Sequence, residues 1–252
     1  MRLKAMVLAL VLGSGPLSAK EPSDAFVASN VVSILYHEIG HAVIDLMRLP
    51  IFGQEEDAAD VLSALLIDEI YEEQTAQNTV RDAAFGFYAE AQNVDEPAYW
   101  DVHGPDEQRY YNLVCLFYGG NPAQRAGLAA QLGLPEDRAE TCQEEYELAY
   151  DSWGPVLDDL AGLSHEIELT NFADGLMADV LIDEIIYFNT LFRFPARVSV
   201  ELISCGEANA FTTLRPCLLP FALNLMPICA GSTMLCDHKG KPRDHKLDFC
   251  RN

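Results

Sequence analysis

The chain has 252 residues and is strongly acidic, with 39 Asp and Glu residues against 16 Lys and Arg residues and a formal net charge of −23 at pH 7. A body this negative repels the phosphates of nucleic acids and anionic membrane surfaces, so we expect no nucleic-acid or membrane partner. The acidic surface could favour cationic or neutral substrates, but solubility in a salty medium explains it equally well. The length suits one catalytic domain with appended elements.

The N-terminus has the pattern of a secretory signal peptide. Arg2 and Lys4 precede an apolar run over residues 5–12, and small residues follow it as far as Ala19. The run is too short to span a bilayer. We therefore predict a signal peptide over residues 1–19 and export to the periplasm or the extracellular space of a bacterium.

A long helix is predicted over residues 25–49, where apolar residues recur at helical spacing. Ser23 or Asp24 can cap its N-terminus. Gly40 lies inside this helix, where a glycine costs about 1 kcal/mol relative to alanine. A glycine at such a position predicts that another segment packs closely against the backbone.

This helix contains the motif HExxH, formed by residues 37–41. His37 and His41 lie one turn apart on the same face, so both imidazoles can bind one tetrahedral metal ion. Glu38 is placed to take a proton from a metal-activated water molecule. The alternative interpretation is a buried helix whose two histidines make only structural hydrogen bonds.

A second helix is predicted to begin at Glu55, after a break that contains proline and glycine. Within it Glu56 and Asp60 form the pattern ExxxD, again one turn apart. One carboxylate can then bind the metal while the other accepts a hydrogen bond from a ligand histidine and fixes its orientation. Acidic residues also favour the first turn of any helix, and we interpret Glu55 and Asp57 in that way.

The two motifs together resemble those of the glutamate zincins, metallopeptidases in which HExxH and a downstream ExxxD or ExxAD build a zinc site. The resemblance implies one zinc ion per chain, with His37, His41 and Glu56 as ligands. It further implies that Glu38 is the general base and that Asp60 supports a ligand histidine.

The chain more specifically resembles a family of secreted bacterial proteins classed as a metallopeptidase-type domain of unknown function. The likeness covers roughly residues 25–211. Its motifs stand here as HEIGHA, GQEEDAAD, DVHGPDEQR, the cysteines at 115 and 142, and CGEANAF at 205–211. Because this family assignment itself depends on HExxH, it says little about the substrate.

Residues 95–104 are predicted to form a polar loop before another helix, which begins at Pro105 or Asp106 and continues through Leu116. Zincins commonly place a further polar side chain opposite the metal to stabilise the oxyanion of the transition state. His103 is our candidate for this role, with Arg109 and Tyr110 behind it. The alternative is a loop that caps the helix and contains an ordinary salt bridge.

All seven cysteines follow the predicted signal peptide, as expected where disulfides can form. We predict that Cys115 pairs with Cys142, since both are flanked by segments that look helical. Cys205 is expected to pair with one of the later cysteines, which leaves an odd thiol. Those later cysteines are Cys217, Cys229, Cys236 and Cys250.

The clearest strand signal covers residues 197–204, where apolar and polar residues alternate. The composition changes after Phe211, where the resemblance ends. We interpret residues 212–252 as a divergent, basic, cysteine-containing tail. A membrane span over residues 214–235 is the alternative, but its three prolines and one asparagine disfavour it.

These patterns predict a mainly α-helical α+β fold, with a metal-binding helix, a second ligand helix and a small β element. We divide the chain into a signal peptide over residues 1–19, a metallopeptidase domain over 20–211 and the tail. The predicted function is zinc-dependent hydrolysis of peptide or protein substrates, with Glu38 as general base and His103 as a further catalytic residue. The alternatives are a secreted zinc-binding or structural protein and a partner-binding protein without peptidase activity.

Overall fold

The computed structural model describes residues 23–170, 174–203, 209–210, 213–214 and 224–229. The helices of this part are α1 (Asp24–Met47), α2 (Glu55–Ile70), α3 (Glu73–Gln92), α4 (Asp106–Gly120), α5 (Pro122–Gln131), α6 (Glu136–Ala161) and α7 (Leu176–Leu191). The strands are β1 (Ile167–Thr170), β2 (Val198–Ile203), β3 (Asn209–Ala210), β4 (Thr213–Leu214) and β5 (Asn224–Cys229). The predicted mainly helical α+β fold is confirmed. The predicted signal peptide and Cys205, Cys217, Cys236 and Cys250 lie outside the described residues.

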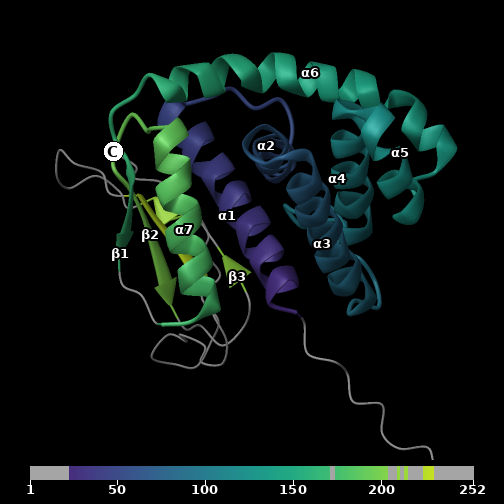
Figure 1. The fold of residues 1–252 in the computed structure, drawn as a ribbon, viewed down its shortest axis with the longest axis horizontal. Helices are drawn as coiled ribbons and strands as arrows, with labels where there is room; N and C mark the ends of the chain where they lie inside the picture. Colours follow the sequence, from purple (N-terminus) through teal and green to yellow (C-terminus); the bar gives the residue numbers. More distant parts are fainter. Residues whose placement is uncertain (1–22, 171–173, 204–208, 211–212, 215–223, 230–252) are drawn as a thin grey trace, which may run out of the picture.

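Helix α1 occupies the middle of the molecule (Figure 1). It packs against α2 and α3 on one side and against α7 on the other. Helix α6 lies across one end of the other helices and packs mainly on α4. As a result the central turns of α1 are buried, and they contribute Leu35, Ile39 and Val43 to the hydrophobic core.

The sequence explains where α1 begins and how it meets α2. Ser23 caps the helix, because its Oγ accepts a hydrogen bond from the N–H of Phe26 at 3.2 Å. The helix ends at Met47, and the next residue, Arg48, adopts a left-handed conformation with φ of 53°. A Cβ atom added to Gly40 would lie 2.9 Å from the Cα of Ala59 in α2. The close packing predicted at Gly40 is therefore present, and it brings HExxH into backbone contact with the second helix.

A small sheet lies beside α7 (Figure 1). Strand β1 pairs in parallel with β2, and β2 pairs in parallel with β5. The two-residue strands β3 and β4 each pair with β5 in antiparallel orientation. The strand predicted at residues 197–204 is confirmed as β2. Its partner β5 belongs to the segment that we interpreted as a divergent tail, so part of this segment joins the sheet.

None of the helices in the described residues combines the length and the apolar character that a membrane crossing requires.

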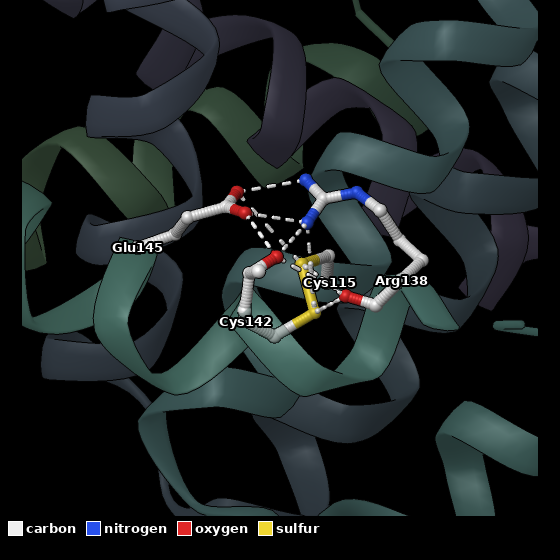
Figure 2. Close-up of a disulfide and its surroundings, with 5 residues drawn as sticks. Cys115, Arg138, Cys142 and Glu145 are labelled. Carbon is white, nitrogen blue, oxygen red and sulfur yellow. Dashed lines mark hydrogen bonds and ion pairs between the residues drawn. A yellow bond between two sulfur atoms is a disulfide. The ribbon is translucent and has the colours of Figure 1, made fainter. Parts of the chain in front are cut away.

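A disulfide joins Cys115 of α4 to Cys142 of α6, with the two Cα atoms 5.1 Å apart (Figure 2). The predicted pairing of these cysteines is confirmed. Beside it, Arg138 and Glu145 of α6 form a two-pronged ion pair, with Nη1–Oε1 and Nη2–Oε2 distances of 2.6 and 2.7 Å. The crosslink fastens α6 to the helix that follows the loop carrying His103.

Candidate metal centre

Three ligand-type side chains converge where α1 faces the first turns of α2. His37 Nε2 lies 3.1 Å from His41 Nε2 and 3.2 Å from Glu56 Oε2, and His41 Nε2 lies 3.1 Å from the same carboxylate oxygen. The three atoms therefore form a nearly equilateral triangle. The helical spacing explains this arrangement, because the two histidines share one face of α1 and Glu56 lies in the first turn of α2.

Both the chemistry and the dimensions of this triangle fit a zinc ion. Two imidazole nitrogens and one carboxylate oxygen form the His₂Glu donor set found in catalytic zinc sites. A tetrahedral zinc with bonds of about 2.0–2.1 Å holds its donor atoms about 3.3 Å apart. The observed separations of 3.1–3.2 Å approach this value.

Each histidine is oriented through its other ring nitrogen. His37 Nδ1 lies 2.7 Å from Asp60 Oδ1, and His41 Nδ1 lies 2.8 Å from Glu55 Oε1. A carboxylate only accepts hydrogen bonds, so each Nδ1 carries a proton and donates it. In the neutral imidazoles the two Nε2 lone pairs then face each other at 3.1 Å, which is repulsive unless a cation lies between them.

The local electrostatics favour positive charge at this point. Burial lowers the pKa of His37, but hydrogen bonds to Asp60 and Glu56 outweigh this effect and raise it to about 9. Burial raises the pKa of Glu56, yet the histidines around it, His103 foremost, hold it far below its ordinary value. The centre therefore retains a carboxylate that needs positive partners, which protons or a divalent metal ion can supply.

Arg109 of α4 supports the carboxylate behind His37. Its Nε and Nη2 donate to Asp60 at 2.8 and 2.9 Å, and its guanidinium lies 4.3 Å from the ring centroid of Phe87. Although burial raises the pKa of Asp60, hydrogen bonds from Arg109 and His37 lower it to about 2. Tyr110, which we expected beside Arg109, instead donates its hydroxyl hydrogen to the carbonyl of Leu132.

The loop before α4 brings a third imidazole to the same place. His103 Nε2 lies 2.9 Å from Glu56 Oε2, and its ring centroid is 6.3 Å from that of His37. One donor atom from each of His37, Glu56 and His103 lies within 4.8 Å of the others. Asp101 stabilises the loop, because its carboxylate accepts a hydrogen bond from the backbone N–H of His103 at 3.1 Å.

Glu38 shares the buried turn of α1 with the two histidines. The residue is 4% exposed, and its negative charge is among the influences that raise the pKa of His37. The structure thus brings together all six residues that the sequence singled out: His37, Glu38, His41, Glu56, Asp60 and His103.

Two further residues belong to this centre and were interpreted differently from the sequence. Glu55, which we regarded as a first-turn acid, contacts His41. Arg109, which we expected behind His103, holds Asp60. Arg109 of α4 and Asp60 of α2 are 49 residues apart in the sequence, and no local pattern predicts their pairing.

Comparison with known proteins gives a match to a protein family. Residues 16–157 match a family model described as "Putative metallopeptidase". The matched stretch contains HExxH, ExxxD, His103 and both cysteines of the disulfide, whereas the CGEANAF motif lies beyond it. Neither the curated proteins nor the solved structures yielded a match. The family model covers more than half of the chain, so this protein belongs to that metallopeptidase family.

Proposed function

We propose that this protein is an exported zinc-dependent peptidase in which His37, His41 and Glu56 hold one zinc ion. One observation carries the proposal: the ligand-type atoms of these side chains lie 3.1–3.2 Å from one another. Membership of a metallopeptidase family supports peptides or proteins as substrates. The Cys115–Cys142 disulfide supports export, because such bonds persist in oxidising compartments.

Zinc in a site with three protein ligands supplies a Lewis acid that polarises the scissile carbonyl and makes a water molecule a stronger nucleophile. Glu38 takes the proton of the attacking water and passes it to the leaving amine as the carbon–nitrogen bond breaks. The position of Glu38 supports this role, since it lies on the same buried turn as both histidines without belonging to the triangle of donor atoms.

We further propose that His103 donates a hydrogen bond to the oxyanion that forms when water attacks the carbonyl. Its side chain is 44% exposed, so a substrate can reach it from solvent. The hydrogen bond to Glu56 raises the pKa of His103, and this effect outweighs that of burial, which lowers the pKa. Asp101 supports the donor from the other side of the ring, 3.4 Å from Nδ1.

A second candidate function is zinc binding without catalysis. It is favoured by the approach of His103 to the same carboxylate oxygen as His37 and His41. If all four side chains bound the metal, the site would have four protein ligands and no position for water or substrate, as in structural zinc sites.

Substitution of Glu38 by glutamine tests the catalytic proposal. Glutamine keeps the shape of the side chain but cannot accept the proton, so hydrolysis should fall at least 10²-fold while zinc content and thermal stability stay near wild type. The measurements are metal analysis by mass spectrometry and digestion of a broad peptide library by the purified full chain. Glu90→Gln, on the exposed side of α3, is the matched control and should cleave like wild type.

Unchanged hydrolysis by Glu38→Gln would overturn the mechanism. A wild-type chain that holds one zinc ion but cleaves nothing in the library would instead support the zinc-binding candidate.

A further inference from the structure

We infer that Glu55 is a positioning residue for His41, fixing the ring so that its Nε2 points at the metal. The inference rests on the proposed function, because it concerns how the same zinc site is assembled. Its basis is the 2.8 Å contact between Glu55 Oε1 and His41 Nδ1. Any first-turn acid can stabilise a helix by interacting with the helix dipole, and that role does not require a contact with His41.

The geometry gives the two histidines equivalent support. Asp60 lies 2.7 Å from Nδ1 of His37, and Glu55 lies 2.8 Å from Nδ1 of His41. Both carboxylates come from the beginning of α2, on either side of Glu56 in the sequence. One helix therefore contributes a ligand-type carboxylate together with the two groups that orient the imidazoles on α1.

Such a contact acts on metal binding in two ways. The carboxylate keeps the proton on Nδ1, so that Nε2 presents its lone pair to the metal, and it makes the ring a stronger ligand. It also limits rotation of the ring, which lowers the entropy lost when the metal binds. Neither effect requires Glu55 to touch zinc or substrate.

The different exposure of the two carboxylates predicts the order of their effects. The side chain of Glu55 is 51% exposed, whereas that of Asp60 is 24% exposed and is also held by Arg109. Water screens and competes with the more exposed contact. Loss of a supporting carboxylate commonly weakens metal binding about 10- to 100-fold. We expect about 3- to 10-fold for Glu55→Gln and a larger effect for Asp60→Asn.

The experiment measures the zinc dissociation constant of the full chain by competition with a chromophoric chelator. Asp57→Asn is the matched control, because it removes one negative charge from the same helical turn. Asp57 lines a cavity that α2 and α4 enclose together with single residues of α1, α3 and α6. The control should bind zinc within about twofold of wild type, and Glu55→Asp, which is one methylene shorter, should resemble Glu55→Gln.

A second measurement separates positioning from general stability. A hydrogen-bonded imidazole N–H gives a far-downfield proton resonance. The one from His41 Nδ1 should shift upfield in Glu55→Gln, because an amide oxygen is a weaker acceptor than a carboxylate, and should keep its position in Asp57→Asn. The metal-free Glu55→Gln and Asp57→Asn chains should unfold at similar temperatures. Equal zinc affinity in these two variants would overturn the inference. Absence of zinc binding by the wild-type chain would overturn the proposed function itself, and the two failures are therefore distinguishable.

Discussion

At the scale of single residues, the carboxylate of Glu56 is the group that all three imidazoles of the candidate metal centre contact. Its Oε2 lies within 3.2 Å of one nitrogen from each of three imidazoles, which come from α1 and from the loop before α4. Two of these imidazoles have a carboxylate 2.7–2.8 Å from the opposite ring nitrogen. The corresponding distance from His103 to Asp101 is 3.4 Å, and its ring is the most exposed of the three. His103 is therefore the least firmly held of the imidazoles, which suits a residue that acts on substrate.

Replacement of His103 by alanine separates its two possible roles. If it donates to the oxyanion, we expect zinc content to remain near one ion per chain while the turnover number falls about 10- to 100-fold. His165→Ala, beside β1, is the control and should change neither quantity. The readouts are metal analysis and peptide hydrolysis on the same preparation. A loss of zinc affinity as large as that of His37→Ala would show instead that His103 is a ligand.

At the scale of helices, the site depends on how closely α1 and α2 approach. Gly40 lies between the two histidines of HExxH, and its Cα faces the backbone of Ala59, the residue before Asp60. A side chain at position 40 would push the helices apart and separate the donor atoms of His37 and Glu56. The requirement for glycine thus links helix packing directly to ligand geometry.

Gly40→Ala should lower stability, although alanine favours a helix by about 1 kcal/mol. The new Cβ would lie 2.9 Å from a backbone atom, which cannot move aside like a flexible side chain. Overpacking of this kind costs about 1–3 kcal/mol, so we expect a net loss in the free energy of unfolding together with weaker zinc binding.

Gly127→Ala is the matched control for this substitution. Gly127 lies in α5 and a Cβ there would meet nothing within 4 Å, so alanine should stabilise the chain by about 0.5–1 kcal/mol. Chemical denaturation of both variants, with and without zinc, measures the difference. Equal stabilisation by the two substitutions would contradict the close approach of the helices.

The elements of the fold were largely predictable, because the periodicity of a helix or strand is visible in residues that are close in the sequence. The helix expected over residues 25–49 is Asp24–Met47, and the strand expected over 197–204 is Val198–Ile203. The same local reasoning identified HExxH and ExxxD. Local reasoning could not show that α7 covers the other side of α1, because the apolar residues of α7 have a similar composition to those of α2.

The contacts between distant segments were the part that sequence reasoning missed. Arg109 reaches Asp60, and Glu184 reaches Tyr36 and Tyr71, across separations of 49 to 148 residues. Such contacts depend on how helices pack, which a single sequence does not encode in any local spacing. Glu55 does lie in the first turn of α2, as expected, but its contact with His41 was not predicted, since a first-turn acid looks the same in sequence whether it faces solvent or a histidine.

At the scale of the whole molecule, a buried carboxylate of α7 connects this helix by hydrogen bonds to α1 and α2, the helices that carry the candidate metal ligands. Glu184 of α7 is 8% exposed and accepts hydrogen bonds from the hydroxyls of Tyr36 in α1 and Tyr71 at the end of α2. Helix α7 in turn leads into β2 of the sheet (Figure 1). The junction therefore couples the position of α1 to the sheet on its other side.

This junction predicts a loss of stability at alkaline pH. Burial, followed by the charge of Glu184, raises the pKa of Tyr71 above that of a tyrosine in the unfolded chain, about 10. A pKa raised by folding contributes stability that is fully present below pH 10 and is lost as pH rises above that value. Tyr71→Phe should be less stable than wild type by about 1.5–3 kcal/mol at pH 8, and the difference should narrow above pH 10.

Urea denaturation of metal-free protein at pH 8 and pH 10.5 measures this narrowing. Tyr99→Phe is the control, because Tyr99 is 80% exposed in the loop before α4 and should follow wild type at both pH values. A constant difference between wild type and Tyr71→Phe would contradict the proposed coupling of the Tyr71 proton to Glu184.

The Cys115–Cys142 disulfide should stabilise the molecule as a whole while leaving the metal centre intact. It closes a loop of 27 residues, for which chain entropy gives about 3–4 kcal/mol, and it joins α4 to α6 rather than α1 to α2. We therefore expect the double variant Cys115→Ala/Cys142→Ala to lose about that much in the free energy of unfolding. Once folded, it should bind zinc within a few-fold of wild type, because α4 still presents Arg109 to Asp60. Denaturation and zinc competition on the non-reduced chains measure both quantities, and a loss of zinc affinity larger than 10-fold in the folded variant would show that the crosslink also positions the metal centre.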